Sequence, residues 1–514
     1  MSLRLYNTMG HKMEEFKPIA ENKVGFYGCG PTVYNYAHIG NLRAYVFLDI
    51  LDKTLTYLGY DIKHVMNITD VGHLTGDADD GKDKMLKTAE ERHQSVLEVA
   101  KFYTDAFFND IERLNIRKPD IVCKATEHIS EMIELIKAIE ANGHTYMAGG
   151  NLYYDVTTYP DYGKLANINL EDLKAGARIE IDENKRNPHD FVLWFTKSKF
   201  ENQALTWDSP WGKGYPGWHI ECSAMSMKYL GKHIDIHTGG IDHIPIHHTN
   251  EIAQSEGSFS EEDRKAGPWV NFWLHNEFLV IAKDKKAAEN GESEKMSKSS
   301  GNFLTLQSII DKGYNALDYR FFLLGGHYRK QIYFSWDAMD GAKAGREALN
   351  SRVAKLISKA KSEENIVLTK DNYSKILEDI SSKIELSESM QKFKSGLEND
   401  LATPIALSAL QKESNGKGRK SIDCLADIYT MDKVLSLSVI ENALIVAEKT
   451  ENESKTEVNN QDDPEAAEIN ALVEKRTLAK KAKDFATSDK IRDELLTRGI
   501  TIIDTPNGPI WKRN

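Results

Sequence analysis

The sequence predicts an α/β fold with a parallel β-sheet, and two stretches near its start carry this prediction. Residues 24–30 (VGFYGCG) form a short apolar run that ends in glycines, as a buried strand does before a turn. A helical pattern follows over 40–58, and the run DIKHVMNI at 61–68 predicts a second strand. Strand–helix–strand alternation is typical of a parallel sheet, which binds ligands at the carboxyl ends of its strands.

The elements that follow are less uniform. Apolar spacing predicts helices over 88–115 and 126–142. Residues 150–216 are rich in Tyr, Trp, Asp and Pro, and we expect irregular structure there, inserted between two halves of a nucleotide-binding domain. The run IDIHTGGID at 234–242 predicts another strand with a glycine turn, and a helix begins in the run PIHHTNEIAQSEG after it.

The last third of the chain predicts a helical domain and a small α+β domain. The pattern is mostly helical from 340 to 450, and residues 451–464 then carry five acidic residues against one lysine, which predicts a mobile linker. The tail predicts a helix over 465–499, a strand at 500–504 and a turn at 506–509.

Composition excludes several classes of protein. At 514 residues the chain has room for about three to four domains, and 40% hydrophobic with 28% charged residues is ordinary for globular proteins. The net charge of −12 argues against a DNA-coating protein. Four widely spaced cysteines argue against a secreted disulfide scaffold. Neither a signal peptide nor a run of roughly 18 apolar residues is present, so we expect a cytoplasmic protein without a membrane span.

The first chemical signal lies at the end of the first predicted strand. The run Gly28-Cys29-Gly30-Pro31-Thr32 lets a ligand approach the backbone closely, and His38-Ile39-Gly40-Asn41 stands where the next helix begins. Free N–H groups at a helix start bind phosphates, and a histidine there can donate a hydrogen bond to a phosphate oxygen. Taken alone, such a motif is more often only a tight strand–helix turn.

The second signal is a histidine cluster, because residues 219–248 hold six histidines where the average for this chain is about one. Cys222 and Glu251 lie beside it, and His247 and Glu251 share a helix face at i, i+4 spacing. With Cys29 they offer two thiolates, an imidazole and a carboxylate, a set that suits Zn²⁺. A single buried histidine or cysteine is more often an ordinary core residue. The six are His219, His233, His237, His243, His247 and His248.

The third signal is Lys295-Met296-Ser297-Lys298-Ser299, followed by Ser300-Gly301-Asn302. Two lysines and several hydroxyl groups around a glycine suit a mobile loop that closes on a polyphosphate, since lysine supplies a compact charge to a developing pyrophosphate. A lone pair of lysines at this spacing is usually part of a solvated surface loop.

In this order the three motifs resemble those of class I aminoacyl-tRNA synthetases. His38 to Asn41 is similar to the HIGH signature of that class, and Lys295 to Ser299 matches the KMSKS signature letter for letter. The surrounding sequence narrows the resemblance to the cysteinyl-tRNA synthetase family over nearly the whole chain. The stretches that carry it are 27–34 (YGCGPTVY), 217–225 (GWHIECSAM), 247–255 (HHTNEIAQS) and 483–511.

The resemblance implies roles for individual residues. The zinc ligands of the family match Cys29, Cys222, His247 and Glu251. The residues implied to act on the ATP phosphates are His38, Asn41, Lys295 and Lys298. The pocket for cysteine and ATP is implied to contain Gly30, Thr32, Trp218, His219, His237 and Asp242, with Trp218 packed on bound cysteine and Asp242 near the adenosine.

The resemblance also implies the order of domains. A Rossmann-type catalytic domain would occupy 1–115 and 211–270, split by a connective peptide insertion at 116–210. The ranges that follow are implied to be the KMSKS loop and stem-contact region at 271–340, a tRNA-binding helical bundle at 341–450, the acidic linker at 451–464 and a C-terminal anticodon-binding domain at 465–514.

The implied reaction joins L-cysteine to tRNA(Cys) in two steps, through an adenylate made from ATP. Mg²⁺ accompanies ATP, and zinc selects cysteine over serine by binding its thiolate, so no editing domain is expected. A monomer is the default of the family. The tail is implied to read the anticodon. Its basic residues can contact phosphates, and its last aromatic and basic residues can stack on or pair with an unstacked base, but a solvated helix face and a packed tryptophan are an equally common interpretation. The residues are Lys475, Arg476, Lys480, Lys481 and Lys483 for the phosphates, and Trp511, Lys512 and Arg513 for the base.

Three features depart from the family pattern. Asn41 replaces the second signature histidine, and it can donate a hydrogen bond but carries no charge. Ile244-Pro245-Ile246 stands where Phe-Pro is usual, and residues 283–294 are longer than expected, with no role that the sequence assigns.

Four other functions fit parts of the pattern. A zinc-dependent ligase that joins cysteine to a sugar amine would share the motifs, but a small acceptor needs no module such as 340–514. A methionine-activating synthetase would carry CxxC pairs, which the sequence lacks. A zinc-supported RNA-binding protein would not need the intact Lys295 to Ser299 motif, and a zinc hydrolase would need a general base, for which Glu221 is the local candidate.

Overall fold

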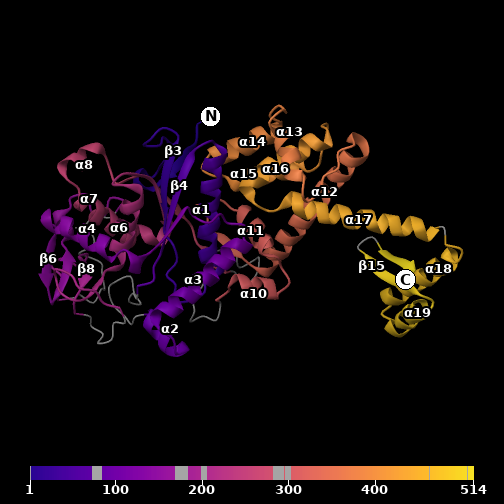
Figure 1. Cartoon of the computed structure of the whole chain (residues 1–514), viewed down its shortest axis with the longest axis horizontal. Coiled ribbons are helices and arrows are strands. Elements are labelled where there is room, and N and C mark those ends of the chain that lie inside the picture. Colours follow the sequence, from indigo (N-terminus) through magenta and orange to yellow (C-terminus); the bar gives the residue numbers. More distant parts are fainter. Residues whose placement is uncertain are drawn as a thin grey trace. The chain divides into compact units, whose positions relative to one another are not determined.

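Five parallel strands form the sheet that the strand–helix alternation predicts, in the order β11-β10-β3-β4-β5. Figure 1 labels two neighbouring strands of this sheet, β3 and β4. β3 (Lys23–Gly28) lies between β4 (Asp61–Ile68), the next strand along the chain, and β10 (Ile234–Gly240), which comes much later. The strand order therefore reverses at β3, and such a point opens a crevice beyond the carboxyl ends of the strands. The outer strands are β5 (Ile121–Lys124) and β11 (Val270–Asn276).

The computed structural model describes residues 2–71, 84–167, 183–197, 205–281, 294–295, 303–461, 463–505 and 508–513. The chain divides into two compact units. The first comprises Met1–Arg346, Leu386–Lys412 and Met431–Leu437, and the second comprises Glu347–Glu385, Glu413–Thr430 and Ser438–Asn514. Within the described ranges, every helix is too short or too polar to pass through a lipid bilayer.

Helix α1 (Ile39–Tyr57) connects β3 to β4 and confirms the helix expected over 40–58. Its apolar residues are buried on nearly every face, and Leu42, Leu51 and Leu55 are fully inaccessible to solvent. A helix that is apolar on all sides is a central helix. Ten residues separate the end of β3 from the start of α1. The N-terminus of α1 lies at the carboxyl edge of the sheet, where its N-cap His38 and its residues Gly40 and Asn41 line a cavity.

The helices around this sheet differ in one place from the expected ones. The pattern over 88–115 predicted a single helix, but the chain forms α2 (Lys84–Arg92) and α3 (Val96–Arg113). The break lies at His93, whose φ of 54° cannot continue a right-handed helix. Ser95 and Glu98 then form a capping box that starts α3. The other helices here are α4 (Ile129–Ala141), α6 (Trp218–Leu230), α7 (Thr249–Gly257) and α8 (Glu261–Ala266).

The stretch 150–216 was expected to be irregular, and this expectation was wrong for three short segments. Its described residues contribute three strands to a four-stranded antiparallel sheet in the order β6-β7-β8-β9. The runs NLYY and FVLWF consist largely of aromatic and apolar residues that favour strands, and the polar residues between them obscured this pattern. The strands are β6 (Thr145–Ala148), β7 (Asn151–Tyr154), β8 (Phe191–Phe195) and β9 (Tyr215–Pro216).

A second, smaller sheet follows the parallel one. β12 (Leu279–Ile281) pairs antiparallel with β13 (Glu294–Lys295) and parallel with β14 (Ile332–Phe334). A hairpin of β1 (Arg4–Asn7) and β2 (Lys12–Glu15) opens the chain. The helices that follow β13 are α10 (Leu306–Asp311), α11 (Ala316–Leu324), α12 (Trp336–Glu364), α13 (Tyr373–Ser381), α14 (Glu388–Glu398), α15 (Thr403–Glu413) and α16 (Ser421–Leu435).

Helix α17 (Val439–Gln461) extends through most of the predicted linker. Residues 451–461 are therefore helical rather than an unstructured linker. Glutamate and lysine are good helix formers, and adding residues to an existing helix avoids the cost of nucleating a new one. The exact domain boundaries given above stay predictions.

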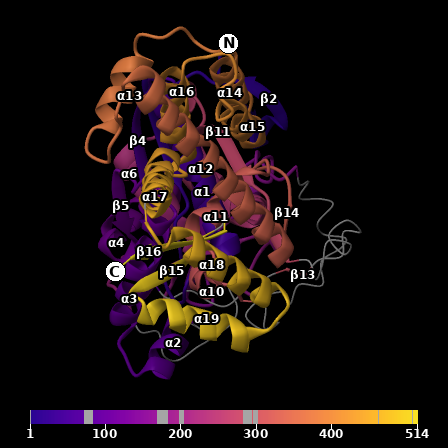
Figure 2. The same cartoon turned by 90° about the vertical axis from the view of Figure 1, so that its right-hand side faces the viewer.

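The tail forms a small α+β module, as its sequence predicts (Figure 2). Where one helix was expected over 465–499, the chain forms α18 (Ala466–Lys481) and α19 (Phe485–Thr497), separated at Lys483 by a φ of 61°. The strands β15 (Ile500–Thr505) and β16 (Gly508–Arg513) pair as a hairpin. Residues 506–507 of the predicted turn lie outside the described residues. The core of the module contains Ile469, Val473, Ile491, Leu495, Ile500 and Trp511.

Candidate active site and metal cluster

A cavity of about 500 Å³ opens at the carboxyl ends of β3 and β10, where the strand order reverses. Its wall combines the turn after β3, the start of α1, the start of α6 and the turn after β10. Most of the residues predicted for the site meet here. The predicted residues that line the cavity are Cys29, Gly30, Thr32, His38, Asn41, Trp218, Cys222, Asp242 and His247.

Gly30 shows why the turn after β3 needs glycine. A Cβ atom at this position would lie 1.7 Å from the carbonyl oxygen of Asn67, which is far inside van der Waals contact. The Gly30 N–H donates to Asn67 Oδ1 over 2.7 Å. The turn therefore packs directly on the backbone of β4, and this holds Cys29 and Thr32 at the cavity wall.

His38 and Asn41 form a reciprocal cap at the start of α1. The Asn41 N–H donates to His38 Nδ1 over 3.0 Å, and the His38 N–H donates to Asn41 Oδ1 over 3.2 Å. Because His38 Nδ1 accepts a hydrogen bond, the neutral ring carries its proton on Nε2. Asn41, which replaces a histidine of the family signature, thus has a structural task of its own as the partner in this capping box.

Below the cavity lies a cluster of thiols, imidazoles and a carboxylate, which we call the thiol–imidazole cluster: Cys29, Cys222, His237, His247 and Glu251. Cys29 follows β3, Cys222 is on α6, and Glu251 is on α7. His247 lies in a π-helical turn, Ile244–His248, that leads into α7. Such turns often occur at functional sites, and here the turn contains the Ile244-Pro245-Ile246 departure from the family pattern.

The donor atoms of this cluster are close enough to share one metal ion. Cys29, Cys222, His247 and Glu251 each place one donor atom within 4.8 Å of the others, so the set predicted from sequence does come together. Two further sets of side chains also have their donor atoms within 4.8 Å of one another. They are Cys29 with His243, His247 and His248, and Cys29 with His237, His248 and Glu251.

The charges in the cluster are mutually stabilising. Burial alone would raise the pKa of Glu251, but the charges of His247 and His237 lower it to about 2. Burial alone would lower the pKa of His247, but Glu251 and Cys29 raise it to about 10. The hydrogen bond with Cys222 holds the pKa of the Cys29 thiol well below its usual range, and the same contact raises the pKa of Cys222. A thiolate and a carboxylate held in their charged forms are suited to bind a cation.

Two buried polar atoms of the cluster form no hydrogen bond with the described residues. Glu251 Oε1 lies 2.7 Å from His247 Nε2 but forms no well-aligned hydrogen bond with any described residue. His237 Nδ1 is also buried without a hydrogen-bond partner in the described part of the chain. Buried polar atoms are normally satisfied, so these atoms indicate a missing partner. A metal ion of the zinc type fits the donor set, because thiolates, imidazole and carboxylate are its usual ligands.

His219 and His237 contact two of the predicted metal ligands, His247 and Glu251, and neither lines the cavity. His219 Nδ1 is 2.9 Å from His247 Nδ1, and His237 Nε2 is 2.8 Å from Glu251 Oε2. Both side chains are buried. Contacts of this kind orient metal ligands, which is a different task from touching the amino acid directly.

Trp218 and Asp242 are placed where they can touch a ligand in the cavity. The Trp218 ring lies 4.5 Å from that of His247, centroid to centroid, and both line the cavity. Asp242 follows the Gly239-Gly240 turn at the end of β10. Lys298 lies outside the described residues, and of Lys295 only the backbone is described, in β13. Their roles at the phosphates therefore stay predictions.

Sequence reasoning missed a hydrogen-bonded chain that supports the cluster. Cys29 Sγ lies 3.5 Å from His248 Nε2, His248 Nδ1 lies 2.8 Å from His275 Nε2, and His275 Nδ1 lies 2.8 Å from Thr8 Oγ1. His275 lies near the carboxyl end of β11, and a histidine at the end of a predicted parallel strand could have been predicted to lie near the site. No pattern in the sequence connects Thr8 to the site.

The sequence is similar to known proteins over its whole length. A family profile described as "tRNA synthetases class I (C) catalytic domain" matches residues 15–344. The cysteine–tRNA ligase of Treponema denticola is 59% identical, with 100% of both chains covered. The chain belongs to the cysteine–tRNA ligase family of class I tRNA synthetases. The cysteine–tRNA ligase of Treponema pallidum strain Nichols is 45% identical, again with 100% of both chains covered.

The family's fold recurs in solved structures of other class I synthetases. Methionyl-tRNA synthetase of Mycobacterium tuberculosis, bound by methionyl-adenylate, superposes with a TM-score of 0.53 at 13% identity. The match covers 82% of this chain and 92% of that chain. At this identity the likeness concerns the fold alone, and it agrees with the predicted α/β catalytic domain followed by helices.

Proposed function

We propose that the chain joins L-cysteine to tRNA(Cys), with ATP converted to AMP and diphosphate. The observation that carries this proposal is the thiol–imidazole cluster at the floor of a cavity whose rim is the capped start of α1. The cluster offers a site selective for sulfur, and the helix start offers a site for phosphates. Full-length similarity to curated cysteine–tRNA ligases supports the same assignment.

In the first step, a carboxylate oxygen of cysteine attacks the α-phosphorus of ATP, and pyrophosphate leaves with its bonding electrons. Negative charge moves onto the leaving group, so groups that stabilise it there accelerate the step. His38 donates from Nε2 to a phosphate oxygen, and the positive end of the α1 dipole adds to the field. Lys295 and Lys298 are proposed to hold the departing pyrophosphate. ATP enters together with Mg²⁺.

For selection of the amino acid, we propose that Cys29, Cys222, His247 and Glu251 hold one zinc ion. When bound, zinc supplies a soft site that prefers a thiolate over the neutral hydroxyl of serine. A plain apolar pocket separates such near-isosteres only modestly. Trp218 packs against the side chain of the amino acid, while Gly30, Thr32 and Asp242 contact the nucleotide. His219 and His237 hold His247 and Glu251 in orientation.

In the second step, the terminal ribose hydroxyl of the tRNA attacks the adenylate carbonyl, and AMP leaves. The C-terminal module is proposed to bind the anticodon, but only through some of the residues that the sequence suggested. Trp511 is 2% exposed and packs in the module core, so it is not available for stacking. Arg476 is buried in an ion pair with Asp504, and Arg513 pairs with Asp463 and Glu465.

Exposed residues of the same module remain suited to RNA. Lys475, Lys481 and Lys483 are exposed, and the large apolar side chains of Leu478 and Phe485 are 59% and 61% exposed beside them in sequence. Lysines can contact phosphates, and Phe485 can stack on a base. We further propose that the protein acts in the cytoplasm as a monomer, as the family resemblance implies.

The test is cysteine-dependent exchange of radiolabelled pyrophosphate into ATP, with serine and methionine in parallel. We expect exchange with cysteine alone, lost after chelation and restored by zinc. Exchange that survives complete zinc removal would overturn the zinc assignment and keep adenylation. No exchange with any of the three amino acids, in folded and zinc-loaded protein, would overturn the proposed function and favour an RNA-binding protein without catalysis.

A further inference from the structure

An exposed aromatic and cationic surface lies at the rim of the cavity. It consists of the exposed Tyr36, Arg92 and Phe102 together with the buried Tyr103 that all three contact, and we call it the rim cluster. Tyr36 stands two residues before His38, Arg92 ends α2, and Phe102 and Tyr103 belong to α3. Tyr36 and Tyr103 also line the cavity, so the rim cluster is continuous with the proposed active site.

The side chains of the rim cluster hold one another in fixed orientations. The Tyr36 and Tyr103 rings meet edge to face at 5.1 Å, and the Phe102 and Tyr103 rings do the same at 5.1 Å. The Arg92 guanidinium lies 4.3 Å from the centre of the Phe102 ring. Its Nε donates to Gln94 Oε1 over 2.9 Å, and its Nη1 donates to the Tyr103 hydroxyl over 3.3 Å. The plane of the cation is therefore set before any ligand arrives.

The side chains of the rim cluster differ in how far they are exposed to solvent. Tyr103 is 6% exposed, whereas Tyr36 and Phe102 are 42% and 37% exposed. Large aromatic rings in this position present apolar faces to water next to a fixed positive charge. That combination suits a flat, π-rich group on an anionic backbone, since unpaired nucleobases stack on aromatic rings and arginine planes while cations attract phosphates.

We propose that the rim cluster binds an unpaired nucleobase from the 3′ end of the tRNA and so positions the terminal ribose over the cavity. This inference rests on the proposed function, because the ribose must reach an adenylate held inside the cavity. The unpaired nucleotides next to that ribose then have to cross the rim. Tyr36, Arg92 and Phe102 act as positioning residues, since they touch the tRNA away from the reacting atoms.

The test separates tRNA transfer from cysteine activation, which needs no RNA. Phe102→Ala and Phe102→Leu both remove the aromatic face, and the leucine variant keeps apolar volume in case the alanine variant folds poorly. Leu97→Ala is the matched control, because Leu97 is 52% exposed on the same helix outside the cluster. Aminoacylation kinetics and pyrophosphate exchange are measured for each, together with Phe102→Trp, which restores a ring.

We expect both ring-removing variants to lower kcat/KM for tRNA by about 5- to 150-fold, the range for loss of one stacked base, with exchange unchanged. Phe102→Trp and Leu97→Ala should behave as wild type. An unchanged kcat/KM for tRNA in the leucine variant would overturn the inference, as would an equal loss in exchange, which would place the cluster at the adenylate. Absence of exchange in the wild type would instead overturn the proposed function.

A binding experiment identifies which part of the tRNA is involved. The probes are a tRNA(Cys) transcript and the same transcript without its unpaired 3′ nucleotides. Wild-type protein should bind the truncated transcript more weakly, and Phe102→Leu should bind both transcripts equally. If Phe102→Leu weakens binding of both transcripts by the same factor, the rim cluster contacts another part of the RNA and the inference is wrong.

Discussion

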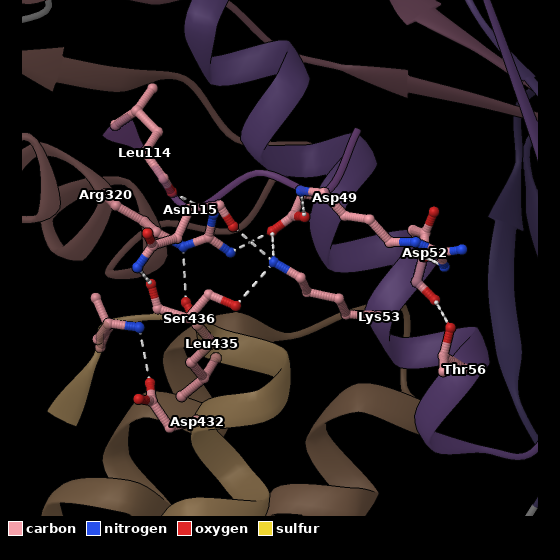
Figure 3. A network of polar contacts seen from close by, with 12 residues as sticks. Asp49, Asp52, Lys53, Thr56, Leu114, Asn115, Arg320, Asp432, Leu435 and Ser436 are labelled. Atoms are coloured by element: carbon pink, nitrogen blue, oxygen red, sulfur yellow. Dashed lines mark hydrogen bonds and ion pairs between the residues drawn. The ribbon is translucent and has the colours of Figure 1, made fainter. Parts of the chain in front are cut away.

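Two buried clusters of ionisable side chains in the first unit differ in how fully the protein satisfies them. The Asp49 network consists of Asp49, Lys53 and Arg320 with the groups that surround them (Figure 3). Lys53 Nζ donates to Asp49 at 2.7 Å, to the Asn115 carbonyl at 2.7 Å and to the Ser436 hydroxyl at 2.8 Å. Three donors thus meet three acceptors around one ammonium group.

Arg320 completes the Asp49 network. It is fully buried, and it donates to Asp49 and to the carbonyl oxygens of Leu114 and Leu435. Asp49 also accepts from the Arg117 N–H at 2.7 Å. The network joins α1 to the ends of α3 and α16. Among the described residues, no side-chain nitrogen or oxygen of Asp49, Lys53 or Arg320 is buried without a hydrogen bond.

The thiol–imidazole cluster contains similar charges but leaves Glu251 Oε1 and His237 Nδ1 without hydrogen bonds to the described chain. An unsatisfied buried polar atom is costly, so it persists where a ligand completes it. Charge and burial alone would rank the two clusters as equals. The difference in satisfied hydrogen bonds is what marks one as scaffold and the other as a binding site.

The largest expected effect follows from removing a donor of the thiol–imidazole cluster. Cys222→Ser should abolish bound zinc and reduce cysteine-dependent exchange by more than about 100-fold, since even residues behind metal ligands cost 10- to 100-fold. Loss of the bound metal should also lower the midpoint of urea unfolding, because a ligand that binds only the folded state stabilises it. Cys123→Ser is the control, because Cys123 is an equally buried thiol whose contact is the Met66 carbonyl. Stoichiometric zinc in Cys222→Ser, measured by mass spectrometry, would contradict the assignment.

A substitution in the Asp49 network should lower the stability of the protein but leave zinc binding and activity intact. Asp49→Asn leaves Lys53 and Arg320 buried without their counter-charge, which should destabilise the first unit by about 3–5 kcal/mol. Zinc content and exchange per folded molecule should stay near wild type. Urea unfolding followed by tryptophan fluorescence measures the first effect. Asp105→Asn is the control, because Asp105 pairs with Lys101 on the surface and is expected to cost well under about 1 kcal/mol. If Asp49→Asn and Asp105→Asn lose similar amounts of unfolding free energy, the Asp49 network does not stabilise the fold.

A smaller effect is expected at His237, which holds Glu251 from behind. His237→Ala removes the partner of Glu251 Oε2 and should weaken zinc binding by about 10- to 100-fold. Excess zinc should restore exchange, which would not happen if the residue contacted the amino acid itself. His233→Ala is the matched control, because His233 directly precedes β10 and its ring contacts the Pro268 carbonyl rather than a predicted metal ligand. A loss of exchange that zinc cannot restore would place His237 in the cysteine pocket.

The contrast between the clusters also explains what the sequence could predict. β4 and α1 were predicted closely because their apolar patterns are local. The four ligands of the proposed metal site were found through residue types and family resemblance, and the structure brings them together. The antiparallel sheet at 145–216 was missed because β8 pairs with β7 and β9, which lie far from it along the chain, although β6 and β7 form a local hairpin. Whether a buried atom is satisfied depends on neighbours from several elements, so no local pattern reports it.

The smallest expected effect lies at Asn41, where a satisfied cap stands inside the functional site. Asn41→Ala removes the acceptor for the His38 N–H and should cost about 0.5–1 kcal/mol of stability, with a modest rise in the KM for ATP. Asn41→Asp separates the two roles of this position. A carboxylate still accepts the His38 N–H and is favoured at a helix start by about 0.3–1 kcal/mol, but it repels the phosphates of ATP.

Asn41→Asp should therefore be at least as stable as wild type and have the higher KM for ATP of the two variants. Thermal unfolding measures the first property, and pyrophosphate exchange at varied ATP measures the second. If Asn41→Asp binds ATP as well as wild type, phosphates do not lie at the start of α1. The cap at His38 would then be a purely structural feature, as fully satisfied as the Asp49 network.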